Sequence, residues 1–252
     1  MIEKSFSVDG SPEVEVRVES GRVEVRRGEP GTVNVTVDTK SSDFIVEQRG
    51  NSILVSSDRT TPWLSRGSAY VVVETPEGSD LRVAVASAPI RVDVGLGKVD
   101  LKTASGDIEL TEAETLVVKT ASGDLDVGTV EHALRFTSAS GDLRVRDRCR
   151  GSVVISTASG DIYIERCDAS INVNTASGDS RIVNFTGRSA SLKGMSGSVT
   201  IGIPRRSEVS LDVNLLSGNL RLPDPEPREG DPERQVSLRA KLVSGDLTIE
   251  RV

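Results

Sequence analysis

Aromatic residues, cysteines and histidines are scarce in this sequence. Phe, Tyr and Trp together make up 3% of the 252 residues, and there are two Cys and one His. A compact globule of this length usually anchors its core on more aromatic side chains, whereas each layer of a repeat protein packs only on its neighbours. Two cysteines do not make a disulfide framework. These shortages favour a repeat architecture over a single globular core.

Long apolar runs are missing as well. No stretch reaches the roughly 18 apolar residues needed to cross a bilayer, so we expect no membrane span. The first ten residues have the pattern of a polar strand rather than that of a charged and then apolar export signal. This predicts a cytoplasmic protein. The alternative is a mature envelope-associated form that carries a new initiator Met.

Positive charge is in deficit. Lys and Arg number 31 against 38 Asp and Glu, which gives a formal net charge of −7. Binding to nucleic acid or to an anionic membrane needs a positive field, so we expect neither partner. The partners that remain are a protein or an envelope polymer.

A Ser-Gly-Asp triplet recurs along most of the chain. The glycines of successive copies are 17 to 19 residues apart up to residue 197, and then 21 and 27 residues apart. Ser196-Gly197-Ser198 and Ser217-Gly218-Asn219 are degenerate copies. The glycines and aspartates of the complete copies are Gly106, Asp107, Gly123, Asp124, Gly141, Asp142, Gly160, Asp161, Gly178, Asp179, Gly245 and Asp246.

Apolar residues alternate with polar ones on both sides of each triplet. Val99 and Leu101 precede the first complete copy, and Ile108 and Leu110 follow it. A period of two indicates strands with one buried face. The repeating unit is therefore a strand, a corner, a strand and a loop, and stacking such units at about 4.8 Å buries a continuous core.

This pattern predicts an all-β fold, a β-solenoid-like stack of two-strand repeats of about 18 residues over 87–252. Residues 1–86 are expected to form a less regular β-meander that caps the stack within one continuous domain. At each corner the glycine supplies a positive φ, and the Ser and Asp side chains are expected to hydrogen-bond the amides of the turn.

The end of the chain is expected to be an open edge. Its last strand, within Asp246–Val252, has nothing after it in the sequence to cover it, and an uncovered edge strand is a site of self-association. If the Pro- and acid-rich segment Pro223–Gln235 folds over this end, the protein is a monomer. If it projects sideways, a homodimer is expected.

The corner triplets, the Pro-containing segments Val73-Glu74-Thr75-Pro76 and Ile201-Gly202-Ile203-Pro204, and the segment Ser20–Val25 resemble the putative-adhesin β-strand-repeat domain, a bacterial family of unknown function. The resemblance covers nearly the whole chain. It implies the same β-repeat fold and a structural or adhesive role, often in exported or lipid-anchored proteins.

The column of corner aspartates allows two interpretations. As turn caps, each carboxylate gains about 1.5–3 kcal/mol from a hydrogen bond to an amide, against about 0.8 kcal/mol of repulsion between neighbours about 5 Å apart in water. As a calcium ladder they would offer oxygen ligands, but the nine-residue calcium repeat is absent. We favour the caps and predict no metal site and no cofactor.

Cysteine and histidine offer no clear catalytic set. Cys149 and Cys167 are one repeat apart, so they are predicted to lie on adjacent layers within reach of a disulfide, as two small semi-buried residues at a turn. His132 is expected on a loop between layers, at the surface, and no catalytic triad is indicated around it. We therefore predict no catalytic residues and no enzyme activity.

Two features are candidates for interaction. Arg144, Arg146 and Arg148, with two further arginines, form a local basic cluster, which is either a docking patch for an acidic partner or a solvated rim paired to Asp147, Glu165 and Asp168. Trp63 is either a binding anchor on a loop or a plug over one end of the stack.

The sequence thus favours a non-catalytic structural or interaction module. Two alternatives stay open. One is a scaffold that polymerises end to end, and the other, less favoured, is a β-helix carbohydrate-active enzyme.

Overall fold

The computed structural model describes residues 1–40, 44–57, 68–223 and 233–252. These residues form strands and turns, and the all-β fold class is confirmed. Contacts divide the chain into two compact units, Met1–Val127 and Gly128–Val252. The boundary predicted near residue 87 stays a prediction.

The first unit contains ten complete strands and the beginning of β11. They are β1 (Ile2–Ser7), β2 (Glu13–Val18), β3 (Ser20–Arg27), β4 (Thr32–Thr39), β5 (Phe44–Arg49), β6 (Ser52–Ser57), β7 (Ser68–Thr75), β8 (Asp80–Val85), β9 (Ile90–Lys102) and β10 (Ile108–Lys119), followed by β11 (Leu125–Ser138).

Residues 1–86 do not form a simple meander. β2 pairs in parallel with β6 and β8, and β3 pairs in parallel with β7 and β9, so these strands already belong to coils of the stack. Antiparallel pairs lie around them: β4 lies between β1 and β7, and β5 pairs with β6. The irregular spacing of turns in the sequence hid the parallel pairs, because the Ser-Gly-Asp corner is degenerate there.

The second unit contains the remaining strands. They are β12 (Leu143–Ser159), β13 (Ile162–Ser177), β14 (Ser180–Phe185), β15 (Ser189–Ser196), β16 (Val199–Ile203), β17 (Ser207–Ser217), β18 (Leu220–Arg221), β19 (Arg234–Ser244) and β20 (Leu247–Arg251). These strands pair with one another in parallel and nearly in register.

The loop expected between repeats is a bend within a continuous strand. β12 has 17 residues and β13 has 16, and each runs as one strand from one side of the coil to the other. The register shifts between Val145 and Cys149, where a bulge makes the bend. A bulge bends a strand locally, so each of these coils has one sharp corner and one bulged bend.

The core is aliphatic and built from in-register columns. Val153, Ile171, Ala190 and Leu238 lie opposite one another on four successive coils, and each is at most 3% exposed. The two largest fully buried side chains are Phe136 and Phe185. The alternation in the sequence therefore assigns the buried faces of the repeat strands correctly.

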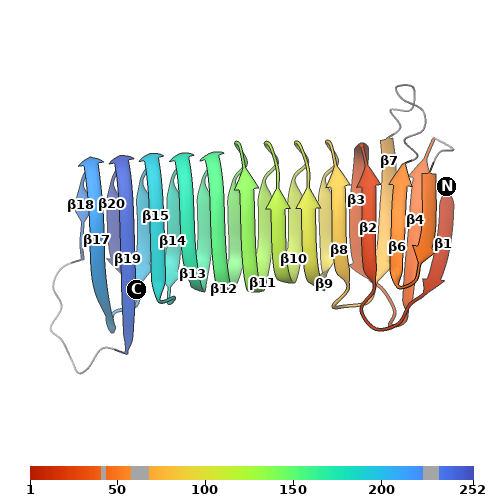
Figure 1. Ribbon diagram of the computed structural model, residues 1–252, viewed down its shortest axis with the longest axis horizontal. Coiled ribbons are helices and arrows are strands. Elements are labelled where there is room, and N and C mark those ends of the chain that lie inside the picture. Colours follow the sequence, from red (N-terminus) through yellow and green to blue (C-terminus); the bar gives the residue numbers. More distant parts are fainter. Residues whose placement is uncertain (41–43, 58–67, 224–232) are drawn as a thin grey trace. The chain divides into compact units, whose positions relative to one another are not determined.

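The last coils are not stacked in the order of the sequence. β19 pairs with β15 on one side and with β17 on the other, and β20 pairs with β16 and β18 (Figure 1). The C-terminal strand is thus an interior strand, and the expectation that Asp246–Val252 forms the open edge is wrong. The edge of this unit is the earlier pair, β17 and β18.

Candidate functional site

The corner aspartates form a ladder between layers. The backbone N–H of Asp161 donates to Oδ1 of Asp142 at 2.7 Å, Asp179 N–H donates to Asp161 at 2.8 Å, and Ser198 N–H donates to Asp179 at 2.8 Å. In the first unit Asp124 N–H donates to Asp107 at 3.1 Å. The expectation that each Asp caps its own turn is therefore corrected: each of these carboxylates binds the amide of the next layer.

A bond of the same kind joins the last two coils, where the corner residue of one coil is Asn219 instead of an aspartate. Asn219 N–H donates to Oδ1 of Asp246 at 2.9 Å, and its side-chain amide donates to the same oxygen at 3.2 Å. The backbone amide of Asn219, together with its side chain and Arg221, lowers the pKa of Asp246 despite some desolvation. The ladder thus holds the degenerate corner in register as well as the complete ones.

The amide inside each of three turns is bound by a residue that the sequence analysis did not single out. The N–H of Gly106 donates to Thr103 Oγ1 at 2.8 Å, and that of Gly123 donates to Thr120 Oγ1 at 2.7 Å. Gly141 N–H donates to Ser138 Oγ at 2.6 Å in the second unit. A hydroxyl residue three positions before the glycine was the available signal.

Glycine is needed at the corners because backbones approach closely there. A Cβ on Gly123 would lie 2.2 Å from the carbonyl oxygen of Gly106, and one on Gly178 would lie 2.3 Å from that of Gly160. Gly160, Gly178 and Gly245 also have φ between 123° and 135°. At Gly106, Gly123 and Gly141, φ is outside the left-handed region, so a positive φ is not the reason for glycine at those three corners.

Calcium is not expected to stabilise the fold. In the ladder bonds between aspartates one carboxylate oxygen already accepts an amide hydrogen, and no group of three or more His, Cys, Asp or Glu among the described residues is placed to hold a metal. We predict the same thermal midpoint in millimolar Ca²⁺ and in chelator. A midpoint that rises by many degrees with Ca²⁺ and falls with chelator would contradict this.

Cys149 and Cys167 lie opposite each other on β12 and β13, as the repeat spacing predicts. Both are free thiols and fully buried, not semi-buried at a turn. The contact with Cys167, together with burial and the nearby charge of Asp168, raises the pKa of Cys149 far above its usual value. A protonated buried thiol is a poor nucleophile. The two cysteines therefore act as core residues of the bend.

His132 is exposed and lies within β11, not on a loop. Its carbonyl oxygen would lie 1.9 Å from a Cβ placed on Gly151, so its backbone is part of the packed bend. Trp63 lies outside the described residues.

The arginine cluster is largely paired within the chain. Arg148 lies 3.2 Å from Asp168, and Arg150 lies 2.6 Å from Glu131. The guanidinium of Arg144 lies over the ring of Tyr163, 5.3 Å from its centre, and the Tyr163 hydroxyl donates to Glu165 at 2.6 Å. These contacts favour the solvated rim; an interaction role for Arg144, Arg146 and Arg148 stays a prediction.

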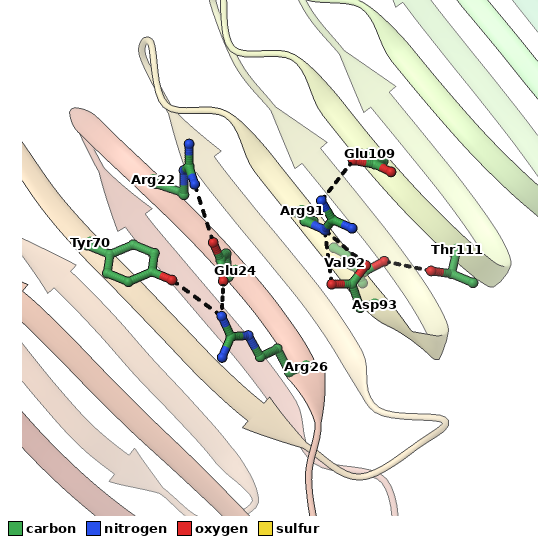
Figure 2. Close-up of polar contacts among 9 residues, drawn as sticks. All are labelled: Arg22, Glu24, Arg26, Tyr70, Arg91, Val92, Asp93, Glu109 and Thr111. Carbon is green, nitrogen blue, oxygen red and sulfur yellow. Dashed lines mark hydrogen bonds and ion pairs between the residues drawn. The ribbon is translucent and has the colours of Figure 1, made fainter.

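Two separate sets of charged contacts lie in the first unit, one on β3 and β7 and one on β9 and β10 (Figure 2). Glu24 is 9% exposed and pairs with Arg26 and, at 3.6 Å, with Arg22. A hydrogen bond from the Tyr70 hydroxyl, aided by both arginines, lowers the pKa of Glu24 although desolvation opposes it. Arg91 on β9 pairs with Asp93 at 3.0 Å. The exposed Arg91–Asp93 pair contributes little stability, whereas the charge of the buried Glu24 is compensated by the two arginines beside it.

The outer face of the second unit, on the strands before the corners, is polar and carries a column of serines, with the ion pair of Asp212 and Arg239 beside it. Ser152, Ser170, Ser189, Ser237 and Ser210 occupy one register position on five neighbouring strands, and all are exposed. Asn172 and Asn174 lie beside this column, and the Asn174 amide donates to Asn172 Oδ1 at 3.3 Å. We call these residues the serine face.

Family models and solved structures agree with this architecture. The model of the family described as Toastrack DUF4097 matches residues 12–250. Among the described residues, no helix is both long and apolar enough to cross a membrane. A search of curated proteins finds no match.

Two solved structures illustrate the likeness. A putative lipid binding protein from Parabacteroides distasonis has 13% identity and a TM-score of 0.56, with 97% of this chain and 96% of that chain covered. A putative adhesin from the same organism has 14% identity and a TM-score of 0.49, with 98% and 96% covered. At this identity the first of these supports the fold, and the resemblance inferred from the sequence is confirmed at the level of the family.

Proposed function

The chain belongs to the Toastrack DUF4097 family, and from this premise we propose that it is a non-catalytic interaction module of the adhesin type. Its ligand is an extended envelope polymer, bound on the serine face. The observation that carries this proposal is the exposed Ser column, repeated in register on five strands.

The serine face suits a polymer with a regular hydrogen-bonding pattern. Its hydroxyls and amides are both donors and acceptors, and they repeat at the strand spacing of about 4.8 Å. They are also held on paired strands rather than on loops, so little side-chain and backbone freedom is lost on binding. A polyhydroxylated chain lying across the strands would meet the same groups at every layer.

The absence of catalysis in this proposal is supported by the state of the reactive groups. Both thiols are buried, the pKa of Cys149 is raised far above neutral pH, and the corner carboxylates accept amide hydrogens. His132 is exposed on its strand rather than enclosed beside a carboxylate that would orient it as a base. General acid–base catalysis needs an acid and a base that are both positioned toward the substrate. The β-helix carbohydrate-active enzyme therefore remains the weaker alternative.

A cosedimentation assay tests this function. We expect the chain to pellet with at least one of peptidoglycan, chitin or cellulose, and the double variant Ser170→Glu/Ser189→Glu to bind at least about tenfold more weakly, because two carboxylates on one face add charge and bulk where hydroxyls contacted the polymer.

The matched control is Thr200→Glu/Thr248→Glu, which adds the same two charges at in-register positions after the corners, on β16 and β20. Its binding should equal that of the wild type. Equal loss in both double variants would mean a general charge effect, and failure of all three polymers to pellet the protein would refute the polymer ligand.

A further inference from the structure

The edge strand β1 in the first unit carries a charge on its inward register. Ile2, Lys4 and Phe6 lie opposite the buried residues Val37, Val35 and Val33 of β4. The Lys4 ammonium donates to the carbonyl oxygen of Val46 on β5 at 2.6 Å. An inward-pointing lysine is a common guard against strand addition, so this edge is protected.

The edge formed by β17 and β18 in the second unit has no such guard within the part of the chain that the structure describes. Its inward positions are Val209, Leu211, Val213, Leu215 and Leu220, all apolar. Among the described residues, β17 pairs only with β19, and β18 only with β20. Within the described part of the chain, one side of this coil therefore presents backbone groups that no strand pairs, next to apolar side chains.

The apolar side chains of this edge are more exposed than their in-register partners on the next coil. Leu211 is 38% exposed, while Leu238, its in-register partner on β19, is fully buried. Leu220 is 42% exposed, while Leu247 opposite it on β20 is fully buried. The edge residues are of the same apolar type as their buried partners, but no described strand covers them.

We propose that the β17–β18 edge binds the same edge of a second copy of this chain, strand to strand and antiparallel, to give a closed two-fold dimer. Strands of this apolar pattern accept one another within the chain, because β19 pairs in parallel on both sides with strands of the same pattern. Between two copies related by a two-fold axis the two β17 strands run antiparallel. A two-fold contact uses one self-complementary patch and then closes.

Charge does not oppose the pairing of two identical edges. Arg206 pairs with Glu233 at 2.6 Å, Asp212 with Arg239 at 2.7 Å, and Arg221 with Asp246 at 3.4 Å. Glu208 accepts a hydrogen bond from Gln235 at 3.5 Å. Since these charges beside the edge are compensated within one chain, two copies can approach without bringing them together as unpaired like charges.

The same observations oppose end-to-end polymerisation. A filament needs two different complementary edges on each molecule, and the β1 edge is guarded by Lys4. The dimer contact is also small, because β17 has 11 residues and β18 has two, against about 20–30 residues per side in a standard stable interface. We therefore expect a concentration-dependent dimer with a dissociation constant in about the micromolar range.

Sedimentation velocity of the full chain over a range from about 1 to 500 µM tests the proposal. We expect a monomer at the low end and a dimer at the high end. Leu211→Lys should weaken the dimer at least about tenfold, because it places a charge on the inward register as Lys4 does on β1. The matched control is Val243→Lys, which replaces an apolar residue that is 48% exposed on β19, the strand next to β17, and not on the edge strand itself.

Hydrogen exchange of the wild type gives a second readout that does not depend on the folding of a variant. Amides of β17 and β18 should exchange more slowly at high than at low protein concentration, while those of β1 should not change. A monomer at every concentration, species larger than a dimer, or an unaltered dimer in Leu211→Lys would each overturn the proposal. The polymer-binding assay can fail separately, since its variants change Ser170 on β13 and Ser189 on β15 and leave the edge strands β17 and β18 unaltered.

Discussion

Replacing Gly178 by alanine is expected to destabilise the protein by about 2–6 kcal/mol. Two costs combine: φ at this position is 123°, where a side chain is strained by about 1–3 kcal/mol, and the new Cβ would lie 2.3 Å from the carbonyl oxygen of Gly160. Overpacking of this kind costs about 1–3 kcal/mol because the layers must separate. Denaturant unfolding followed by circular dichroism would measure the loss.

Two further glycines separate the two costs. Gly50 has φ of 62° and nothing within 4 Å of the place where a Cβ would lie, so Gly50→Ala should show the strain alone, about 1–2 kcal/mol. Gly123 has φ outside the left-handed region but a Cβ that would lie 2.2 Å from Gly106 O, so Gly123→Ala should show the close approach alone. Equal midpoints for Gly178→Ala and Gly50→Ala would refute close approach as the main reason for glycine at the corners.

The repeat strands could be predicted from the sequence because their signal is local and repeated. Val99 and Leu101 alternate with polar residues before one corner, and Ile108 and Leu110 do so after it, and all four are buried in the structure. A period of two over a fixed distance from a Ser-Gly-Asp triplet leaves few other folds. The adjacency of Cys149 and Cys167 followed from the same spacing.

The order of the last coils could not be predicted, because pairing between layers is chosen by packing and not by sequence order. β17 and β19 have the same apolar pattern, and both fit beside β15 by local criteria. The 27-residue spacing between Gly218 and Gly245 is the longest in the series, and β19 follows it and pairs between β15 and β17. Most of the segment Pro223–Gln235 lies outside the described residues, so its expected placement stays a prediction. The longer spacing is visible in the sequence, but the order in which β15, β19 and β17 stack is not.

The partners of the corner aspartates were also beyond the sequence. A carboxylate at a turn can bond its own turn or the adjacent layer, and the choice depends on how near the next amide lies. In this protein Thr103, Thr120 and Ser138 bind the amides inside their turns, which leaves the aspartates for the layer beside them. The serines of the serine face stand at a constant distance before their corners in the sequence, but the parallel pairing of the strands is needed to place them side by side.

Replacing Asp161 by alanine should cost about 1.5–3 kcal/mol of stability. The variant removes the oxygen that accepts the Asp179 amide at 2.8 Å, a bond to a charged acceptor. The Asp161 amide keeps its own acceptor on Asp142, so one bond of the ladder is lost. Chemical denaturation should show a lower midpoint with an unchanged slope, because the surface exposed on unfolding is nearly the same.

Two matched variants decide whether the lost bond is the cause. Asp161→Asn keeps an oxygen at the same place and removes the charge, so it should lose less stability than alanine does. Asp147→Ala removes an exposed carboxylate of β12 away from the corners and should change stability by no more than about 0.5 kcal/mol. If Asp161→Ala and Asp147→Ala cost the same, the corner aspartates are ordinary surface charges. If Asp161→Asn loses as much as alanine, charge rather than the hydrogen bond holds adjacent layers in register.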